Sequence, residues 1–260
     1  MGSSSIQGEL WGARAKDWAE LQEPMGKPLW EDMLSVSAIE KGSKFLDAGC
    51  GSGGASFLAS ELGADISGID ASEALIKLAR NRIPRGNFKI GDLESMPFND
   101  NHFDLTFAAN SIMFASDHGA AVRELARVTS PGGFIITAVW GHPEKCDMLD
   151  IFRAVINALP SPPTGPGPFA LSGSGALETL YSAAGITVKG AGEIDCTFKY
   201  DNFPAMWKAQ FSAGPIQGAV RAAGESSIRN AIESASSRFT DENGSISLTN
   251  RFRYVFGSKQ

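Results

Sequence analysis

The sequence predicts an α/β fold in which helices cover both faces of a doubly wound, mostly parallel sheet. Short apolar runs alternate with segments of helical periodicity from Lys44 to Trp140, at spacings that suit right-handed parallel crossovers. The nearly continuous apolar run Phe103 to Asn110 is typical of a strand that is covered on both faces. A chain of 260 residues is long enough to bury one large core of this kind.

The segment from Lys44 to Asp70 organises the rest of the chain. An apolar strand ends in Asp47, glycines crowd positions 49 to 54, a helical segment follows, and a second strand ends in Asp70. Glycine permits positive φ and lets a ligand approach the backbone, while the helix that follows offers free N–H groups. An acid about twenty residues further on can accept hydrogen bonds from both ribose hydroxyls. The unit therefore predicts a nucleotide-type ligand at the carboxyl ends of the strands.

Two ligand classes use such a unit. Residues Gly49 to Gly54 satisfy the GxGxxG pattern of a dinucleotide site, which is weak evidence when it stands alone. Asp47 distinguishes between the two ligand classes, because a carboxylate two positions before Gly49 would repel a pyrophosphate and suit a cationic ammonium group. S-adenosylmethionine carries an ammonium group and a sulfonium but no phosphate, so Asp47 favours this ligand over NAD.

Several motifs between Phe45 and Trp140 resemble, in order and at the usual spacing, those of the class I S-adenosylmethionine-dependent methyltransferases. The chain is most similar to the small-molecule branch, methyltransferase type 11, which includes the quinone methyltransferases. The matching stretches are LDAGCGSG from Leu46, the ribose motif Gly68 to Ser72, the adenine motif Gly91 to Phe98, FDLTFAANSIMF from Phe103, and RVTSPGGFIITAVW from Arg127.

The resemblance implies a Rossmann-like sheet of seven strands, with an antiparallel last strand inserted between the fifth and the sixth, and helical lid segments. It implies S-adenosyl-L-methionine as the cofactor and methyl transfer by in-line displacement to a small, aromatic or apolar acceptor. Two alternatives stay open at this point. One is a cofactor-binding sensor or pseudo-enzyme subunit, and the other, which Asp47 and Asp92 disfavour, is a nicotinamide-dependent oxidoreductase.

The resemblance also implies which residues contact the cofactor. Asp92 follows the third strand, in register with Asp70, and would accept a hydrogen bond from the adenine amine while Leu93 supplies a backbone N–H; alternatively, Asp92 only caps a turn. Asn110, with Ser111 and Met113, leaves the carboxyl end of the fourth strand toward the methyl-transfer zone. The predicted cofactor residues in the core are Asp47, Gly49, Gly51, Asp70, Ala71, Asp92, Leu93 and Asn110.

The N-terminal residues 1–40 are expected to form a helical lid. Leu10 to Leu21 reads as one helix with Trp11 and Trp18 on its apolar face, and either tryptophan could simply be core. In related methyltransferases an N-terminal segment folds over the cofactor, so that Trp18 would cover it and Arg14 would reach its methionine carboxylate. The first residues, MGSSS, are expected to be flexible and are left out of the fold reasoning.

The other elements are predicted from helix N-cap residues, apolar patterns and turn-forming residues. Ser72 is expected to cap a helix, Ser116 or Asp117 is expected to start the next one, and Pro131 to Gly133 is expected to be a turn. The remaining predicted elements are a short helix over Leu29 to Ile39 and strands over Phe88 to Ile90, Phe134 to Trp140, Ile186 to Tyr200 and Arg251 to Phe256.

We expect a cofactor-binding core over residues 41–142, with 143–260 completing the same domain and contributing lid insertions at 143–175 and 203–245. Within these insertions, 145–159, 203–211 and 215–238 read as helical, and the five prolines of 160–169 predict an irregular loop. Met206, Trp207 and Phe211 would either line an apolar acceptor pocket or belong to the core, and the sequence leaves both alternatives open.

The chemistry needs few catalytic groups, because the sulfonium is already a strong methyl donor and positioning supplies much of the acceleration. A general base is required only for a protonated acceptor, and His118 and His142 follow the carboxyl ends of the fourth and fifth strands. Either histidine could instead be an ordinary surface or loop residue. With Asn110 they are the candidate catalytic residues. No cluster has metal-ligand spacing, so no metal is predicted.

The composition limits the kinds of binding partner and the cellular location that we expect for this protein. A net charge of −6 argues against a nucleic-acid partner, since that requires clustered Lys and Arg. Three widely spaced cysteines predict free thiols in a reducing compartment. No apolar run is long enough for membrane insertion and no signal peptide is evident, so a cytoplasmic protein is expected, acting on a small-molecule acceptor and able to form a homodimer.

Overall fold

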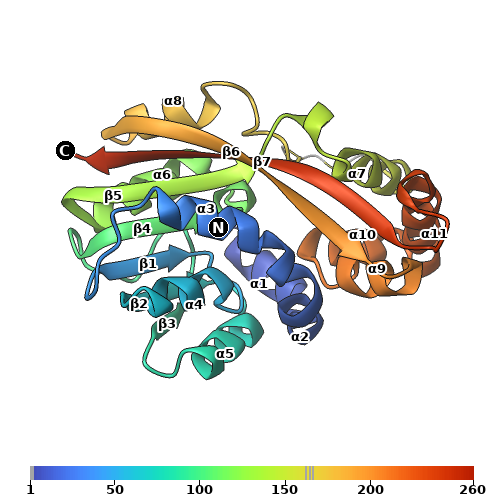
Figure 1. The fold of residues 1–260 in the computed structure, drawn as a ribbon, viewed down its shortest axis with the longest axis horizontal. Helices are drawn as coiled ribbons and strands as arrows, with labels where there is room; N and C mark the ends of the chain where they lie inside the picture. The colour runs from blue at the N-terminus through green and yellow to red at the C-terminus, as the bar shows by residue number, and fades with distance from the viewer. Residues whose placement is uncertain (1–2, 162, 164, 166) are drawn as a thin grey trace.

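The computed structural model describes residues 3–161, 163, 165 and 167–260. Its centre is a seven-stranded sheet in the order β3-β2-β1-β4-β5-β7-β6 (Figure 1). The first five strands are parallel, and β7 lies antiparallel between β5 and β6. The predicted Rossmann-like fold and the inserted antiparallel last strand are therefore confirmed. The strands are β1 (Lys44–Ala48), β2 (Asp65–Asp70), β3 (Asn87–Ile90), β4 (Phe103–Ala109), β5 (Thr129–Trp140), β6 (Ile186–Tyr200) and β7 (Ile246–Lys259).

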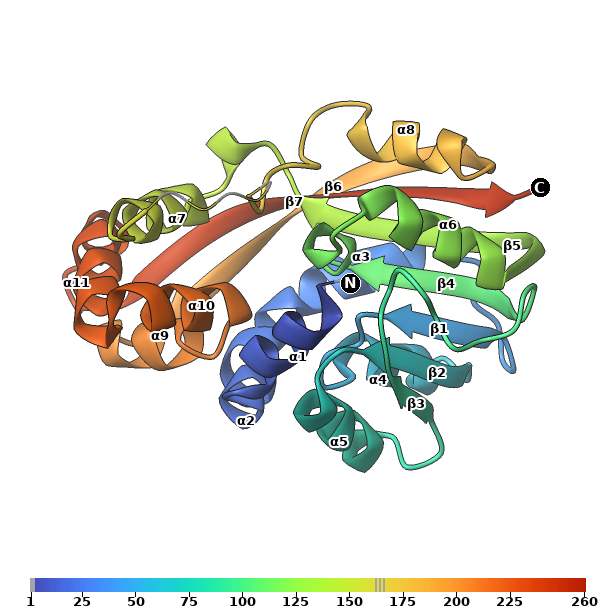
Figure 2. The ribbon, with the colours of Figure 1, turned by 180° about the vertical axis from the view of Figure 1, so that it is seen from behind.

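Helices cover both faces of the sheet (Figure 2). On one face lie α3 (Lys27–Ser35), α4 (Gly54–Glu61) and α5 (Glu73–Arg82), and on the other lie α6 (His118–Val128) and α8 (Ala176–Ala183). The predicted caps are present, since the Ser72 side chain accepts a hydrogen bond from the N–H of Leu75 and the Asp117 side chain accepts one from Ala120. Ser72 starts α5 directly after the end of β2, and Asp117 starts α6 after a 3₁₀ turn over Ile112–Phe114 that follows β4. Both helices therefore begin on the carboxyl side of the sheet, where ligands bind in such folds.

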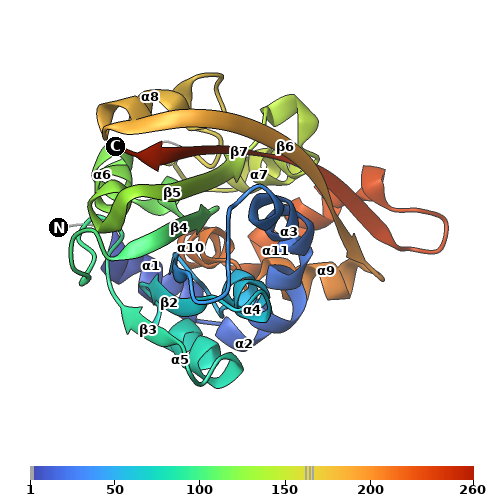
Figure 3. The same ribbon diagram turned by 60° about the vertical axis from the view of Figure 1, so that its left-hand side comes forward.

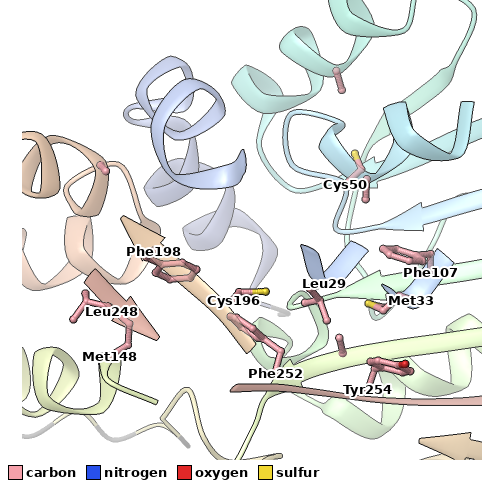
Figure 4. Packing of buried hydrophobic residues seen from close by; sticks show 14 of the residues in the cluster. Leu29, Met33, Cys50, Phe107, Met148, Cys196, Phe198, Leu248, Phe252 and Tyr254 are labelled. Carbon is pink, nitrogen blue, oxygen red and sulfur yellow. The ribbon is translucent and has the colours of Figure 1, made fainter. Parts of the chain in front are cut away.

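Strands β6 and β7 continue past the end of β5. Residues 252–258 of β7 pair with β5, whereas β6 is the strand that residues 246–251 pair with. This two-stranded ribbon carries α7 (Met148–Asn157), α9 (Phe203–Gln210), α10 (Gly214–Ala223) and α11 (Glu225–Ser236), which we call the distal lobe (Figure 3). Figure 4 shows that its interior, with Phe198 and Leu248, continues into the core of the sheet.

Two strand predictions needed correction. β7 runs well beyond Arg251 to Phe256, because it pairs with β6 along its whole length. β5 starts at Thr129, so that Pro131 to Gly133 is an irregularity within the strand and not a separate turn; the register with β4 shifts there. A bulge accommodates a proline, which cannot donate a ladder hydrogen bond. Of the expected proline-rich loop, residues 162, 164 and 166 lie outside the described residues.

The N-terminal prediction was wrong in two respects. The expected single helix over Leu10 to Leu21 is broken, because α1 (Ser4–Gly12) ends before Arg14, whose φ of −137° and ψ of 44° are not helical. The chain then continues through α2 (Ala15–Asp17), a π-helical turn over Trp18–Gln22 and a 3₁₀ turn over Glu23–Gly26. From Ser3 onward the expected flexible start is ordered, since the Ser3 hydroxyl donates to the carbonyl of Phe114 at 2.5 Å. Tertiary contacts of α1 have overridden local propensity here.

Candidate active site

The glycine-rich turn joins β1 to α4 at the carboxyl edge of the sheet. Gly49, Gly51 and Gly53 have φ values of 85°, 53° and 83°, a conformation that favours glycine. A Cβ on Gly49 would lie 2.2 Å from the Cβ of Ser111, so this glycine also permits the turn to pack against the end of β4. The predicted glycines therefore have a structural reason in the fold itself, while their backbone still faces the edge where ligands bind in such sheets.

Two carboxylates flank this turn. Asp47, at the end of β1, is 2% exposed, and its Oδ2 accepts a hydrogen bond from the Ser56 hydroxyl at 2.6 Å. Burial raises the pKa of Asp47 to about 7, against the effect of the Ser56 hydrogen bond, and the nearby Glu23 and Asp70 raise it further. A buried acid that lies beside two other acids favours a cationic ligand.

Asp70, at the end of β2, is bound by the turn itself. Its Oδ2 accepts from the N–H of Gly51 at 2.9 Å, and its Oδ1 accepts from the N–H of Ser72 at 2.8 Å. Burial raises the pKa of Asp70 to about 6, although both of these backbone hydrogen bonds lower it. Since each carboxylate oxygen has a second lone pair, both oxygens can still accept from vicinal hydroxyl groups.

The predicted adenine side of the site is a tight turn after β3. The Oδ1 of Asp92 accepts from the N–H of Glu94 at 2.9 Å, which is the turn-capping role that the sequence left as the alternative. Leu93 is half-buried and packs against the core of the α6 face. Ala71 lies beneath α1, because a Cβ on Gly8 would lie only 2.3 Å from its carbonyl oxygen. Gly8 thus allows α1 to rest directly on the ribose motif.

Asn110 ends β4 in a left-handed conformation with φ of 54°. Its N–H donates to the carbonyl of Ala138 at 2.9 Å, whereas its side-chain Oδ1 is buried without a hydrogen-bond partner. A strained backbone and an unpaired buried oxygen at a strand end are features that cluster at ligand sites. The geometry thus fits a ligand-binding role for Asn110.

The two candidate histidines lie at the same edge but differ in exposure. His118 is half-buried at the start of α6, where its Nε2 lies 3.4 Å from the carbonyl oxygen of Met113. His142 follows β5, is exposed, and precedes a 3₁₀ turn. Their catalytic roles stay predictions.

The N-terminal segment covers the glycine turn. Trp11 packs edge-on against Trp18 and Phe114, with ring centroids 4.6 Å and 5.3 Å apart. The indole Nε1 of Trp18 lies 3.7 Å from where a Cβ of Gly51 would be, so Trp18 sits directly over the turn. Arg14 faces the distal lobe, with its guanidinium 4.3 Å from the centre of the Phe211 ring. Its predicted contact with a cofactor carboxylate therefore requires a different rotamer.

Sequence reasoning missed Glu23. This acid is 6% exposed and accepts a hydrogen bond from the N–H of Ser52 at 2.7 Å and another from the Ser52 hydroxyl. Arg82 of α5 pairs with it at 3.0 Å. No local pattern distinguishes Glu23 from the exposed Glu20, because its partners lie 29 and 59 residues away.

Of the two alternatives for Met206, Trp207 and Phe211, the structure supports the core. Met206 is fully buried, and Trp207 and Phe211 stack with their ring centroids 4.9 Å apart. A different aromatic group follows the carboxyl end of β5, where half-buried Trp140 packs edge-on against Phe152 and Phe169.

An open groove of about 570 Å³ lies between α1, the first turns of α5 and Arg221. Gly12 and Ala13 form its α1 side, and Ser72 and Lys77 form its α5 side. The groove thus borders the ribose motif from outside the lid. Within the described part of the chain, no helix is long and apolar enough to span a membrane, and no group of three or more His, Cys, Asp or Glu could hold a metal ion.

Comparisons with known proteins find similarity over the same residues. Residues 46–137, which include the glycine turn, both acids and Asn110, match the model of a methyltransferase domain. A malonyl-[acyl-carrier protein] O-methyltransferase of Serratia marcescens is 35% identical over 137 residues, which are 53% of this chain and 52% of the relative. The chain spans about half the length of the curated relatives it matches.

Solved structures share the fold over most of the chain. The YcgJ protein of Bacillus subtilis has a TM-score of 0.63 and 22% identity, covering 90% of this chain and 99% of that one. The geranyl diphosphate C-methyltransferase of Streptomyces coelicolor A3(2), determined with S-adenosyl-L-homocysteine, has a TM-score of 0.52 and 15% identity, covering 90% and 79%. At these identities the likeness concerns the fold alone.

Proposed function

We propose that this chain, whose residues 46–137 belong to the class I S-adenosylmethionine-dependent methyltransferases, transfers a methyl group from that cofactor to a small acceptor. The observation that carries the proposal is the pair of enclosed acids around the glycine turn. Asp47 and Asp70 make the turn a binding site for a ligand with positive charge and ribose hydroxyls. Asp47 would repel a pyrophosphate there, which disfavours NAD, whereas Asp70 suits the ribose of either ligand.

Each site residue then has a role in holding the cofactor, which supplies an electrophilic methyl group when bound. Asp47 faces the ammonium group, and Asp70 accepts from the ribose hydroxyls. The backbone around Gly49, Gly51 and Ala71 shapes the crevice, and Asp92 and Leu93 take the adenine. Asn110 offers its free oxygen near the transferred methyl group.

Residues 1–40 act as the lid in this proposal. The lid docks on Ala71 and over Gly51, where it would exclude water and hold the acceptor in line with the methyl group. Trp18 closes the turn, and Arg14 swings from Phe211 to the cofactor carboxylate when the site fills. His118 or His142 serves as general base for an acceptor that carries a proton.

The acceptor is proposed to be small and aromatic or apolar. Trp140, Phe152 and Phe169 form an apolar, half-buried cluster where β5 ends, between the sheet and the distal lobe. The segments 143–175 and 203–245 would then form its walls. Because a curated relative is named for a malonyl carrier-protein substrate, a malonyl thioester belongs in any acceptor panel.

Isothermal titration calorimetry with S-adenosylmethionine and with NAD tests the ligand. We expect binding of the sulfonium compound and none of NAD, and the reverse would refute the proposal. Formation of S-adenosylhomocysteine with a panel of phenols, apolar carbon acids, amines and a malonyl thioester tests catalysis. Binding without turnover on the whole panel would favour the sensor or pseudo-enzyme alternative.

A further inference from the structure

Gln22 and Glu23 are consecutive polar residues that are both buried, at 7% and 6% exposure. They lie where the π-helical turn of the N-terminal segment becomes a 3₁₀ turn. Their side chains make hydrogen bonds in two different parts of the molecule. Such departures from α-helical geometry often mark functional positions, and two adjacent buried polar side chains require a reason.

Glu23 is bound to the glycine turn. Its carboxylate accepts from both the N–H and the hydroxyl of Ser52 and pairs with Arg82. The N–H of the preceding residue, Gly51, donates to Asp70. Two successive amides of the turn are therefore held by two acids, one from the N-terminal segment and one from β2. Hydrogen bonds to a charged acceptor are the stronger kind, so Glu23 contributes directly to the shape of the turn.

Gln22 is bound to the distal lobe. Its Oε1 accepts from the Tyr200 hydroxyl at 2.9 Å, and the same hydroxyl accepts from the Nε2 of Gln210 at 2.8 Å. Tyr200 ends β6 and Gln210 ends α9, and they are 5% and 3% exposed. A buried hydrogen-bond network of this kind fixes the relative positions of the elements that it joins.

We propose that Gln22 and Glu23 couple the distal lobe to the glycine turn, so that Tyr200 acts through Gln22 on the placement of Glu23. Glu23 is thus a positioning residue for the cofactor, and it acts by holding Ser52. The inference rests on the proposed function, which assigns the turn to the cofactor and the lobe to the acceptor. Its consequence is that a change in the lobe alters cofactor affinity without touching the cofactor site.

Hydrogen exchange on the unliganded protein tests the coupling itself. Glu23→Ala and Tyr200→Phe should each raise the exchange rate of the 49–54 segment at least about threefold relative to β4, which serves as the internal reference for global stability. The matched controls are Glu20→Ala and Tyr181→Phe. Glu20 is an exposed acid of the same segment, and Tyr181 is a buried tyrosine whose hydroxyl is hydrogen-bonded to Thr137 and Val255. Neither control should change this ratio.

Calorimetry with S-adenosylhomocysteine is the second measurement. Tyr200→Phe should weaken binding about threefold and Glu23→Ala about tenfold, and the double variant should lose less than the product of the two. If Tyr200→Phe leaves the 49–54 segment unchanged while Glu23→Ala does not, the coupling is refuted. If the exchange changes appear but the wild-type protein binds neither S-adenosylhomocysteine nor S-adenosylmethionine, the coupling stands and the proposed function fails.

Discussion

Replacing Asp47 with asparagine should stabilise the unliganded fold at neutral and alkaline pH while weakening cofactor binding. Asp47 is enclosed beside two other acids, and the only hydrogen bond to its side chain in the described structure comes from Ser56. The oxygen of asparagine can accept that same hydrogen bond, so the substitution removes charge with little change in shape.

The magnitude follows from the pKa. Burial raises the pKa of Asp47 from its ordinary 3.8 to about 7, so the ionised carboxylate is favoured in the unfolded chain. For an acid shifted in this direction, stability is lost as the pH rises from the unfolded to the folded value. The cost is absent below about pH 4 and complete above about pH 7, where it reaches about 4 kcal/mol. Asparagine should recover about 2 to 4 kcal/mol of this at pH 8.

Urea denaturation of both proteins between about pH 5 and pH 8 measures the effect. The advantage of Asp47→Asn should be about 1.5 kcal/mol at pH 5 and should grow until about pH 7. Asp65→Asn, which alters an exposed acid at the start of β2, is the control and should show no such trend. A variant that is less stable than wild type at pH 8, or an advantage independent of pH, would refute the reasoning.

Three further predictions concern the site. Cofactor affinity by calorimetry should rise about tenfold from pH 6 to pH 8, because Asp47 must ionise to hold a cation. Asp47→Asn should remove most of this dependence and leave only the part that the ionisation of Asp70 contributes. Gly8→Ala should lower the melting temperature by several degrees and weaken cofactor binding, because its Cβ would lie 2.3 Å from the Ala71 carbonyl oxygen. The control Gly218→Ala should do neither, because the nearest atom to its Cβ, Cδ1 of Leu10, lies 3.7 Å away. Asn110→Gly should gain up to about 1 kcal/mol of stability by relieving its positive φ while turnover falls at least about tenfold, and Asn101→Gly, with the same φ of 54°, should leave turnover unchanged.

Each of these has a clear contrary result. An affinity that does not vary with pH would remove Asp47 from the cation site. An unchanged melting temperature in Gly8→Ala would mean that α1 does not depend on its contact with the ribose motif. Full turnover in Asn110→Gly would show that the free amide oxygen has no part in the reaction.

The sequence by itself determined the sheet and the part of the site that belongs to the sheet. Acids at strand ends, a glycine turn and capped helices are local signals, because the residues that define them lie within a few positions of one another. The ends of β1 and β2 and the caps of α5 and α6 were therefore predictable. Parallel strands bring such ends to one edge, so Asp47 and Asp70 could be placed together in advance.

Only the tertiary structure decided what lies over that edge. The N-terminal helix breaks at Arg14, and Gly8 docks on Ala71; neither feature is encoded by a local propensity. In the sequence Glu23 cannot be told from a surface acid, because its partners Ser52 and Arg82 are distant in the chain. Contacts across such separations depend on how whole elements pack, and periodicity or caps carry no information about that packing.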